Sequence, residues 1–331
     1  MAEQTPLFDT DGAPSPVAPA DWPTEVQALA DHLHRRHGGR LHLGTSSWHF
    51  PGWQGLVWAG RHDPLTLSRH GLNAYARHPL LRCVSLDRTF YRPLEAAGYA
   101  LLAAQVDPDF RFVVKAPALV ADAVRRDPDT GAALGANTLF LDPATALNQA
   151  LRPAVAGLKQ QLGVLVFQLS PLPGTWRNDM TVLMRQLQAL WDALLPELPT
   201  QARLALEVRD PGLLTRALAA QLKTNGVRYC LGLHDRMPSA REQLPMLRAT
   251  WPGDLVCRWN LQPGQGYAQA RDRWAPFDRL QAPDPATRNT LAQVIRATLD
   301  AGQHAWVTIN NKAEGSGPLS VLALAQALGV R

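Results

Sequence analysis

Short apolar runs alternate with longer amphipathic segments along most of the chain. Eight runs have the length of buried strands, and each is followed by a segment whose apolar residues recur at helical spacing. The runs cover residues 41–46, 82–87, 110–115, 164–169, 203–208, 228–234, 255–260 and 305–310. Because strands and helices alternate, the pattern predicts a parallel sheet whose strands are joined by crossover helices.

Helical periodicity predicts eight crossover helices and one helix that precedes the first strand. The crossover helices cover residues 64–78, 93–106, 144–162, 180–195, 213–225, 240–250, 285–301 and 318–328. Pro245 interrupts the sixth of them, because a proline cannot donate a hydrogen bond in a helix interior. The additional helix is expected over residues 25–37, with Thr24 as its N-cap and Gly38-Gly39 as its end.

The number of strand–helix units favours a closed barrel. Eight units predict an α/β fold of the (β/α)8 TIM-barrel class. The alternative is an open doubly wound sheet, which usually has a G-x-G-x-x-G turn after an early strand. The first strand here leads into Gly44-Thr45-Ser46-Ser47-Trp48, which lacks that turn. We therefore expect a single barrel domain over residues 24–331, after a disordered, proline-rich tail over residues 1–23.

Polar side chains occupy one face at the end of these runs. In the fifth run Leu204 and Leu206 share one face, and Glu207 and Arg209 fall on the other, because side chains alternate along a strand. The polar residues with the same placement are Asp87, Lys115, Gln168, Glu207, Arg209, His234, Arg258, Asn260 and Asn310. Active sites of such barrels lie at the C-terminal ends of the strands, so this pattern predicts a shared polar mouth.

Cations dominate the predicted mouth. Lys115, Arg209 and Arg258 follow from the third, fifth and seventh strands, and guanidinium groups bind carboxylate or phosphate oxygens bidentately. Asn310 and Asn311 add amide donors that suit a developing oxyanion. We therefore expect a small or terminal anionic group, a phosphate or a carboxylate, as the ligand. Further candidates for binding it are Trp48, Asp87, Tyr91 and Gln168.

Two residues are candidates for catalysis if the chain is an enzyme. Glu207 is the main candidate for a general base, although Arg209 beside it is expected to keep its pKa low. Lys115 is the second candidate, because a desolvated lysine at a barrel strand end can act as a Schiff-base nucleophile. The sequence leaves open whether the barrel catalyses a reaction or only binds a ligand.

Three other interpretations of the mouth remain open. The charged residues can neutralise one another as an ion-pair network. Asp87, Glu207, His234 and Asp235 can bind a divalent metal, as in barrel isomerases and endonuclease-like hydrolases. The third interpretation is a non-catalytic binding module, in which aromatic residues after the first strand stack on a sugar or a base. These residues are Trp48, Phe50, Trp53 and Trp58. Alternatively, the same residues pack their loop onto the rim of the barrel.

Composition narrows these interpretations only slightly. The 331 residues have a net charge of +5 and a pI near 9.4, but no arginine-rich arm supports nucleic-acid binding. Three cysteines without a C-x-x-C motif favour a reducing compartment, and no run of 18 apolar residues predicts a membrane span. Because no secretory signal is present, we expect a cytoplasmic protein. No cofactor is expected, and the oligomeric state is not indicated.

Several motifs resemble those of one family, the DUF72 or YecE-like proteins. The motifs are Gly44–Trp48, Thr89–Arg92, Phe112–Lys115, Phe167–Pro171, Glu207–Arg209, Arg258 and Asn310-Asn311 with Gly315–Pro318. The resemblance runs in order from about residue 41 to the end of the chain. It implies a TIM barrel without an established biochemical role. The recurrent polar residues of the family fall on Tyr91, Lys115, Gln168, Glu207, Arg209, Arg258, Asn310 and Asn311.

The chain departs from the pattern of that family at four positions. Ser85 and Asp87 stand where the family often has a Glu and an Asn. Asp210 and Asn260 each replace a histidine, after the fifth-strand and seventh-strand arginines. Because a Glu and two histidines of the family pattern are replaced, the chain is either a typical member or a divergent or inactive branch with changed chemistry.

Overall fold

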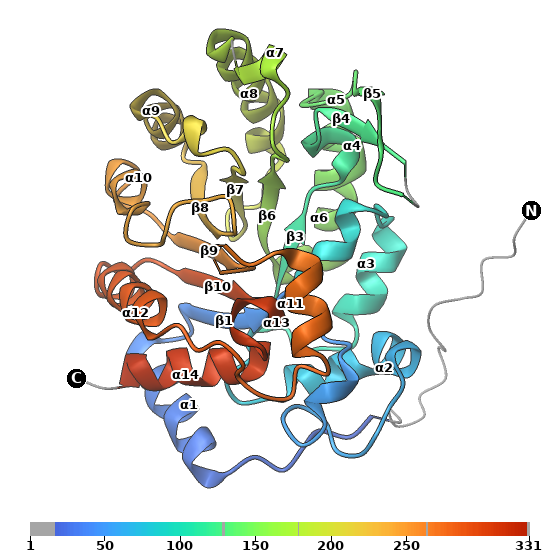
Figure 1. The fold of residues 1–331 in the computed structure, drawn as a ribbon, viewed down its shortest axis with the longest axis vertical. Coiled ribbons are helices and arrows are strands. Elements are labelled where there is room, and N and C mark those ends of the chain that lie inside the picture. Colours follow the sequence, from blue (N-terminus) through green and yellow to red (C-terminus); the bar gives the residue numbers. More distant parts are fainter. Residues whose placement is uncertain (1–16, 128–129, 178, 263, 330–331) are drawn as a thin grey trace, which may run out of the picture.

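A closed parallel barrel forms the centre of the structure, a computed structural model that describes residues 17–127, 130–177, 179–262 and 264–329. Around the barrel the strands follow the order β1-β10-β9-β8-β7-β6-β3-β2 (Figure 1). Their bounds are β1 (Leu41–Thr45), β2 (Cys83–Leu86), β3 (Arg111–Lys115), β6 (Leu162–Gln168), β7 (Arg203–Glu207), β8 (Arg228–Leu233), β9 (Leu255–Trp259) and β10 (Ala305–Ile309). The predicted barrel, with a strand at each of the eight apolar runs, is confirmed.

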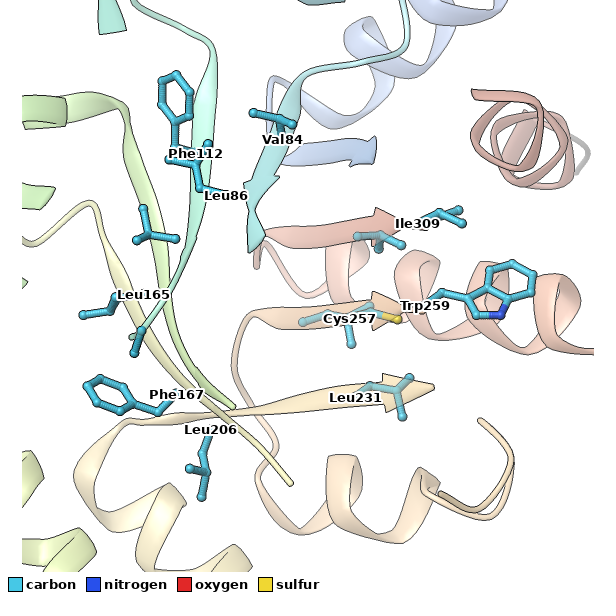
Figure 2. Close-up of a cluster of buried hydrophobic side chains, with 14 of the residues drawn as sticks. Val84, Leu86, Phe112, Leu165, Phe167, Leu206, Leu231, Cys257, Trp259 and Ile309 are labelled. Atoms are coloured by element: carbon cyan, nitrogen blue, oxygen red, sulfur yellow. The ribbon is translucent and has the colours of Figure 1, made fainter. Parts of the chain in front are cut away.

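The two faces of the strands bury different sets of side chains. Large apolar side chains point from the ring of strands toward the helices, among them Phe112, Phe167 and Trp259 (Figure 2). A separate cluster fills the barrel interior and consists of Val113, Val164, Val166, Ala205, Cys230, Val256 and Trp306. Each interior residue is one position away from a helix-facing one, as strand geometry requires. The alternation predicted from the sequence is therefore confirmed.

Helices surround the barrel in Figure 1. The helices that lie at predicted helical segments are α1 (Thr24–His37), α2 (Pro64–Ala76), α3 (Ala96–Ala103), α6 (Arg152–Leu158), α8 (Met180–Leu194), α9 (Arg216–Asn225), α10 (Leu244–Ala249), α12 (Pro285–Asp300) and α14 (Gly317–Gly329). Acceptor side chains begin several of them: Asp63 accepts from two backbone N–H groups of α2, and Asp284 accepts from one of α12. Among the described residues, no helix is both long and apolar enough to cross a membrane.

Some helix predictions need correction. The helix predicted over residues 93–106 is confined to α3, and the one predicted over 144–162 is broken into α5 (Pro143–Ala146), a π-helical turn at Leu147–Leu151, and α6. Four other helices were not predicted: α4 (Ala118–Ala121), α7 (Gly174–Arg177), α11 (Tyr267–Trp274) and α13 (Asn311–Glu314). The connection after β3 also contains an antiparallel hairpin of β4 (Val124–Arg126) and β5 (Ala133–Ala136).

The N-terminal predictions are partly wrong. Thr24 is the first residue of α1 rather than its cap, which is Pro23, and no side chain caps the helix. The helix ends at Gly38 in a left-handed conformation, as predicted. The predicted disordered tail extends too far, because Val17 is buried and the Trp22 indole Nε1 donates to the backbone oxygen of Leu56 at 2.9 Å. Residues 1–16 of that predicted tail lie outside the described residues.

Candidate functional site

Arg258 lies at the centre of the mouth and connects two neighbouring carboxylates. Its side chain, from β9, is buried, with Nη1 2.5 Å from Glu207 Oε2 and Nη2 2.6 Å from Asp87 Oδ1. Burial alone lowers the pKa of Arg258, but Asp87 and Glu207 outweigh burial and raise it. Arg258 is therefore held permanently charged between the ends of β2 and β7.

Glu207 is committed to two arginines. Its side chain is fully buried, and its second oxygen, Oε1, lies 2.6 Å from Arg209 Nη2. Gly232 on β8 leaves the space for it, since a Cβ there would lie 3.0 Å from Glu207 Cγ. Burial raises the pKa of Glu207, but Arg209 and Arg258 outweigh burial and lower it. The interpretation as an ion-pair network thus holds for Glu207, Arg209 and Arg258.

Lys115 differs from the two arginines. Its Nζ, at the end of β3, lies 3.6 Å from the centroid of the Phe90 ring. Among the ion pairs of the described residues, none includes Lys115, although only 7% of it is exposed. Burial is the main reason that the pKa of Lys115 falls to about 7, and the charge of Arg258 lowers it further. The ammonium is therefore the cation of the mouth that lacks a carboxylate partner.

The rim of the mouth is polar and partly open to solvent. Gln168 accepts a hydrogen bond from Arg209 Nη2 at 3.1 Å, and Ser85 Oγ donates to Asp87 Oδ1 at 2.6 Å. The Asp87 side chain is 29% exposed and that of His234 is 24% exposed. Burial is the main reason that the pKa of His234 falls to about 4, so its imidazole is neutral at pH 7. Asp87 and His234 are thus the partly exposed members of this group, whereas Gln168 is buried.

The two asparagines predicted to bind an oxyanion have structural partners. Asn310 Nδ2 donates to Ser46 Oγ at 2.7 Å, while its Oδ1 caps α13. Asn311 is buried, and its Oδ1 accepts from the Trp53 indole at 3.1 Å and from the backbone N–H of Gly317 at 2.7 Å. Asn311 thus anchors the start of α14 rather than joining the ionic cluster.

Two predicted ligand-binding residues also lie apart from this cluster. Trp48 is buried, and the Cζ atom of Arg88 lies over its indole ring, 5.0 Å from the ring centroid. Tyr91 is 79% exposed and contacts the ring of Phe90 edge-on. Trp53 and Trp58 are fully buried and stack on each other, so the packing interpretation of the aromatic loop is confirmed for them.

Lys312 is a charged neighbour of the mouth that the sequence analysis missed. It lies on α13, which like α11 lies inside the ring of outer helices (Figure 1). Burial lowers the pKa of Lys312 to about 8, Arg271 lowers it further, and Asp87 opposes them. Strand alternation did not identify Lys312, because it follows β10 within a helical turn. The Asn-Asn-Lys order after the last strand was the available signal.

The proposed metal ligands do not form a metal cluster in the described part of the chain. There, no group of three or more His, Cys, Asp or Glu side chains has an arrangement that could hold an ion. Arg258 lies between Asp87 and Glu207 and is paired with both. His234 is instead paired with its neighbour Asp235. The guanidinium of Arg258 therefore takes the place between the carboxylates of Asp87 and Glu207 that a metal ion would occupy.

Comparisons with known proteins agree with the barrel fold and with the family resemblance. A DUF72 crystal structure from Enterococcus faecalis is similar over 89% of this chain and 100% of its own, with 15% identity and a TM-score of 0.59. Another, from Thermotoga maritima, covers 87% and 98% at 17% identity and the same TM-score. At these identities the likeness supports the fold alone. No curated protein matches the chain. The family described as protein of unknown function DUF72 matches residues 42–331, so the chain belongs to the DUF72 family.

Proposed function

We propose that the mouth of the barrel binds a small molecule with a phosphate or carboxylate group. The observation behind this proposal is an excess of positive charge. Three cations from barrel strands, Lys115, Arg209 and Arg258, share two carboxylates, Asp87 and Glu207. Because an unpaired buried charge is costly, an anion next to Lys115 would offset the cost of burying its ammonium.

Lys115 rather than Glu207 is the residue that exchanges a proton in this proposal. Both Glu207 oxygens are in ion pairs and its pKa is lowered, so protonation would break two contacts between buried groups. Lys115 has a pKa of about 7, so near neutral pH both its protonation states are populated. The protonated amine binds an anion, and the neutral amine accepts a proton or attacks a carbonyl.

The arginines have a positioning role in this proposal. Arg258 holds Glu207 and Asp87 on either side, and Arg209 links Glu207 to Gln168. These contacts fix the charges around Lys115 before a ligand arrives, which reduces the reorganisation needed on binding. The rim residues Asp87, Gln168 and His234 then contact the part of the ligand that lies outside the mouth.

Isothermal titration with inorganic phosphate and with acetate at pH 7 tests the proposal. Loss of a hydrogen bond to a charged group costs roughly 1.5–3 kcal/mol, so Lys115→Met is expected to weaken binding about 10- to 100-fold. Lys223→Met is the matched control, because Lys223 is an exposed lysine on α9. Equal affinity of wild type and Lys115→Met for both anions, or no binding at millimolar concentration, would contradict it.

Proton uptake gives a second measurement on the same samples. An anion stabilises the ammonium form, so binding at pH 7 to 8 is expected to raise the pKa of Lys115 and take up a proton. With acetate, whose carboxylate stays ionised at pH 7 to 8, the heat of binding should then depend on the ionisation enthalpy of the buffer in the wild type and in Lys223→Met. Residual binding by Lys115→Met should lose that dependence, and its persistence would assign the proton to another group.

A further inference from the structure

A large cavity lies at the opposite end of the barrel from the mouth. It lies between the N-terminal ends of β1, β3, β7 and β10 and the helix α1, and has a volume of about 750 Å³. Binding sites for small molecules usually measure about 300–1,000 Å³, so this basal cavity has the size of a site for an organic ligand. It shares no lining residue with the ionic cluster of the mouth.

The walls of the basal cavity are strongly basic. They include four arginines but only two aspartates, and five of the ten histidines of the chain. Arg203 is paired with Asp254, which also accepts from the backbone N–H of His304 at 2.7 Å. Among the ion pairs of the described residues, none includes Arg82 or Arg111. Asp109 interacts electrostatically with Arg111 without forming an ion pair, so neither guanidinium group is fully neutralised.

Arg82 and Arg111 belong to adjacent strands. Arg82 immediately precedes β2, and Arg111 is paired in register with Cys83 at the start of β3. The Arg111 backbone N–H donates to the Arg82 carbonyl at 3.2 Å, and Arg111 Nη1 donates to the Pro108 carbonyl at 2.6 Å. Both side chains are half-buried. Two partly desolvated guanidinium groups at neighbouring strand ends match the several oxygens of a phosphate.

An aromatic wall lies beside these arginines. His42 stacks on Trp306 with ring centroids 3.7 Å apart, and its Nε2 is 3.1 Å from Nδ1 of His304. Burial lowers the pKa of His42, and the charges of His304, Arg111, Arg82 and Arg203 lower it further. The rings of His42 and His304 are thus uncharged at neutral pH, and both line the cavity together with the edge of the buried Trp306. The cavity therefore combines a place for an anionic group with a place for a planar one.

We propose that the basal cavity is a second binding site, which takes a small aromatic phosphate monoester. Arg82 and Arg111 bind the phosphate oxygens, and the ring of the ligand packs along the wall formed by His42, His304 and Trp306. This site is independent of the mouth and does not rest on the function proposed for Lys115.

The test uses phenyl phosphate as the probe, with inorganic phosphate for comparison. Isothermal titration is carried out with the wild type and with Lys115→Met, which lacks the lysine proposed to bind an anion at the mouth. Binding at the basal cavity is expected to remain in Lys115→Met and to be tighter for phenyl phosphate than for phosphate. Arg82→Met and Arg111→Met, each added to Lys115→Met, are expected to weaken it about 10-fold or more.

Arg216→Met is the matched control, because Arg216 is an exposed arginine at the start of α9. It should leave the affinity for phenyl phosphate unchanged. Circular dichroism and the midpoint of urea unfolding establish that each variant is folded. The proposal is overturned if folded Lys115→Met does not bind phenyl phosphate at millimolar concentration, or if folded Arg82→Met and Arg111→Met bind it as tightly as the control. Neither result affects the proposal for the mouth, which is tested by the loss of anion affinity in Lys115→Met relative to the wild type.

Discussion

Arginines lie at both ends of the barrel, but their charges are neutralised to different extents. At the C-terminal mouth, Arg209 and Arg258 are buried and share the carboxylate of Glu207. At the N-terminal end, Arg82 and Arg111 are half-buried and line the same cavity as His42 and His304, whose pKa values are lowered. The mouth is therefore organised internally, with Lys115 as its surplus charge. The basal cavity is less neutralised and more open to an external anion.

This comparison separates two uses of a buried cation. A guanidinium that is paired and hydrogen-bonded on both sides helps to hold the fold, since removing its partner leaves an uncompensated charge. A guanidinium without a carboxylate costs free energy in the empty protein, and a ligand that supplies the missing charge regains that cost. The following predictions test that difference at each end, in order of expected effect.

Removing the shared carboxylate of the mouth should have the largest effect on stability. Glu207→Gln leaves Arg209 and Arg258 without the charge that lies between them. The free energy of unfolding is expected to fall by about 3–5 kcal/mol, as for other broken buried pairs. Urea unfolding at pH 7 measures it.

The control for that substitution is an exposed ion pair of the same type. Glu197 pairs with Arg152 at 2.7 Å, but their side chains are 39% and 53% exposed. Glu197→Gln should therefore change the unfolding midpoint little, because water screens the pair. If Glu207→Gln were as mild as Glu197→Gln, the buried network would not stabilise the mouth, and the contrast between the two ends would fail.

Lys115 should give the wild type a distinct pH dependence. Its pKa is about 7 in the folded chain and near 10.5 in the unfolded chain, so between these values the unfolded chain binds more protons. The free energy of unfolding should rise with pH across this window by roughly 1.4 kcal/mol per unit from this group, and level off above it. Below pH 7 both states are protonated and the contribution is constant.

Lys115→Met is expected to abolish that part of the slope, whereas Lys223→Met should retain it. Urea unfolding at pH 7, 8 and 9 gives the comparison, because all other groups are common to the three proteins. A slope that is unchanged in Lys115→Met would mean that the amine is not desolvated in the folded chain. In that case the excess charge proposed for the mouth would be hydrated, and the argument for a bound anion would weaken.

The strands and their faces were predictable because a period of two residues is a local property. Leu206 and Glu207 are assigned to opposite faces by adjacency alone, whichever strands lie beside them. The pairing of Glu207 with Arg258 was not predictable, since 51 residues separate them and only the closed barrel determines the distance. For the same reason the sequence left open whether these groups form a network or bind a ligand.

Other features depended on contacts that have no sequence period. Val17 is buried although its segment is rich in proline, and Pro19 in the same segment forms an isolated β-bridge with Trp58. Lys312 follows a strand in a helical turn, where alternation gives no direction. The polar pattern at the C-terminal ends of the strands gives no information on Arg82 and Arg111, which lie at the opposite ends of their strands. The walls of the basal cavity also require α1, whose position over the barrel is a tertiary feature.

His42 gives the smaller pH effect, at the basal end. Its pKa in the folded chain lies well below 6.5, so below pH 6.5 the unfolded chain binds a proton that the folded chain does not. The stability that His42 contributes is present above pH 6.5 and is lost as the pH falls. His42→Gln has no titrating group at position 42. As the pH falls from 6.5 to 5, its free energy of unfolding should therefore decrease less than that of the wild type, with a difference of up to roughly 1.4 kcal/mol per pH unit.

The matched control for that substitution is His32→Gln, an exposed histidine on α1. Its loss of stability between pH 6.5 and 5 should follow the wild type, as measured by urea unfolding. Identical slopes in His42→Gln and the wild type would mean that His42 takes up its proton in the folded chain, despite its burial and the charges of Arg82, Arg111 and Arg203. Those arginines would then be screened by water, and the basal cavity would lose the positive potential that distinguishes it from the paired charges of the mouth.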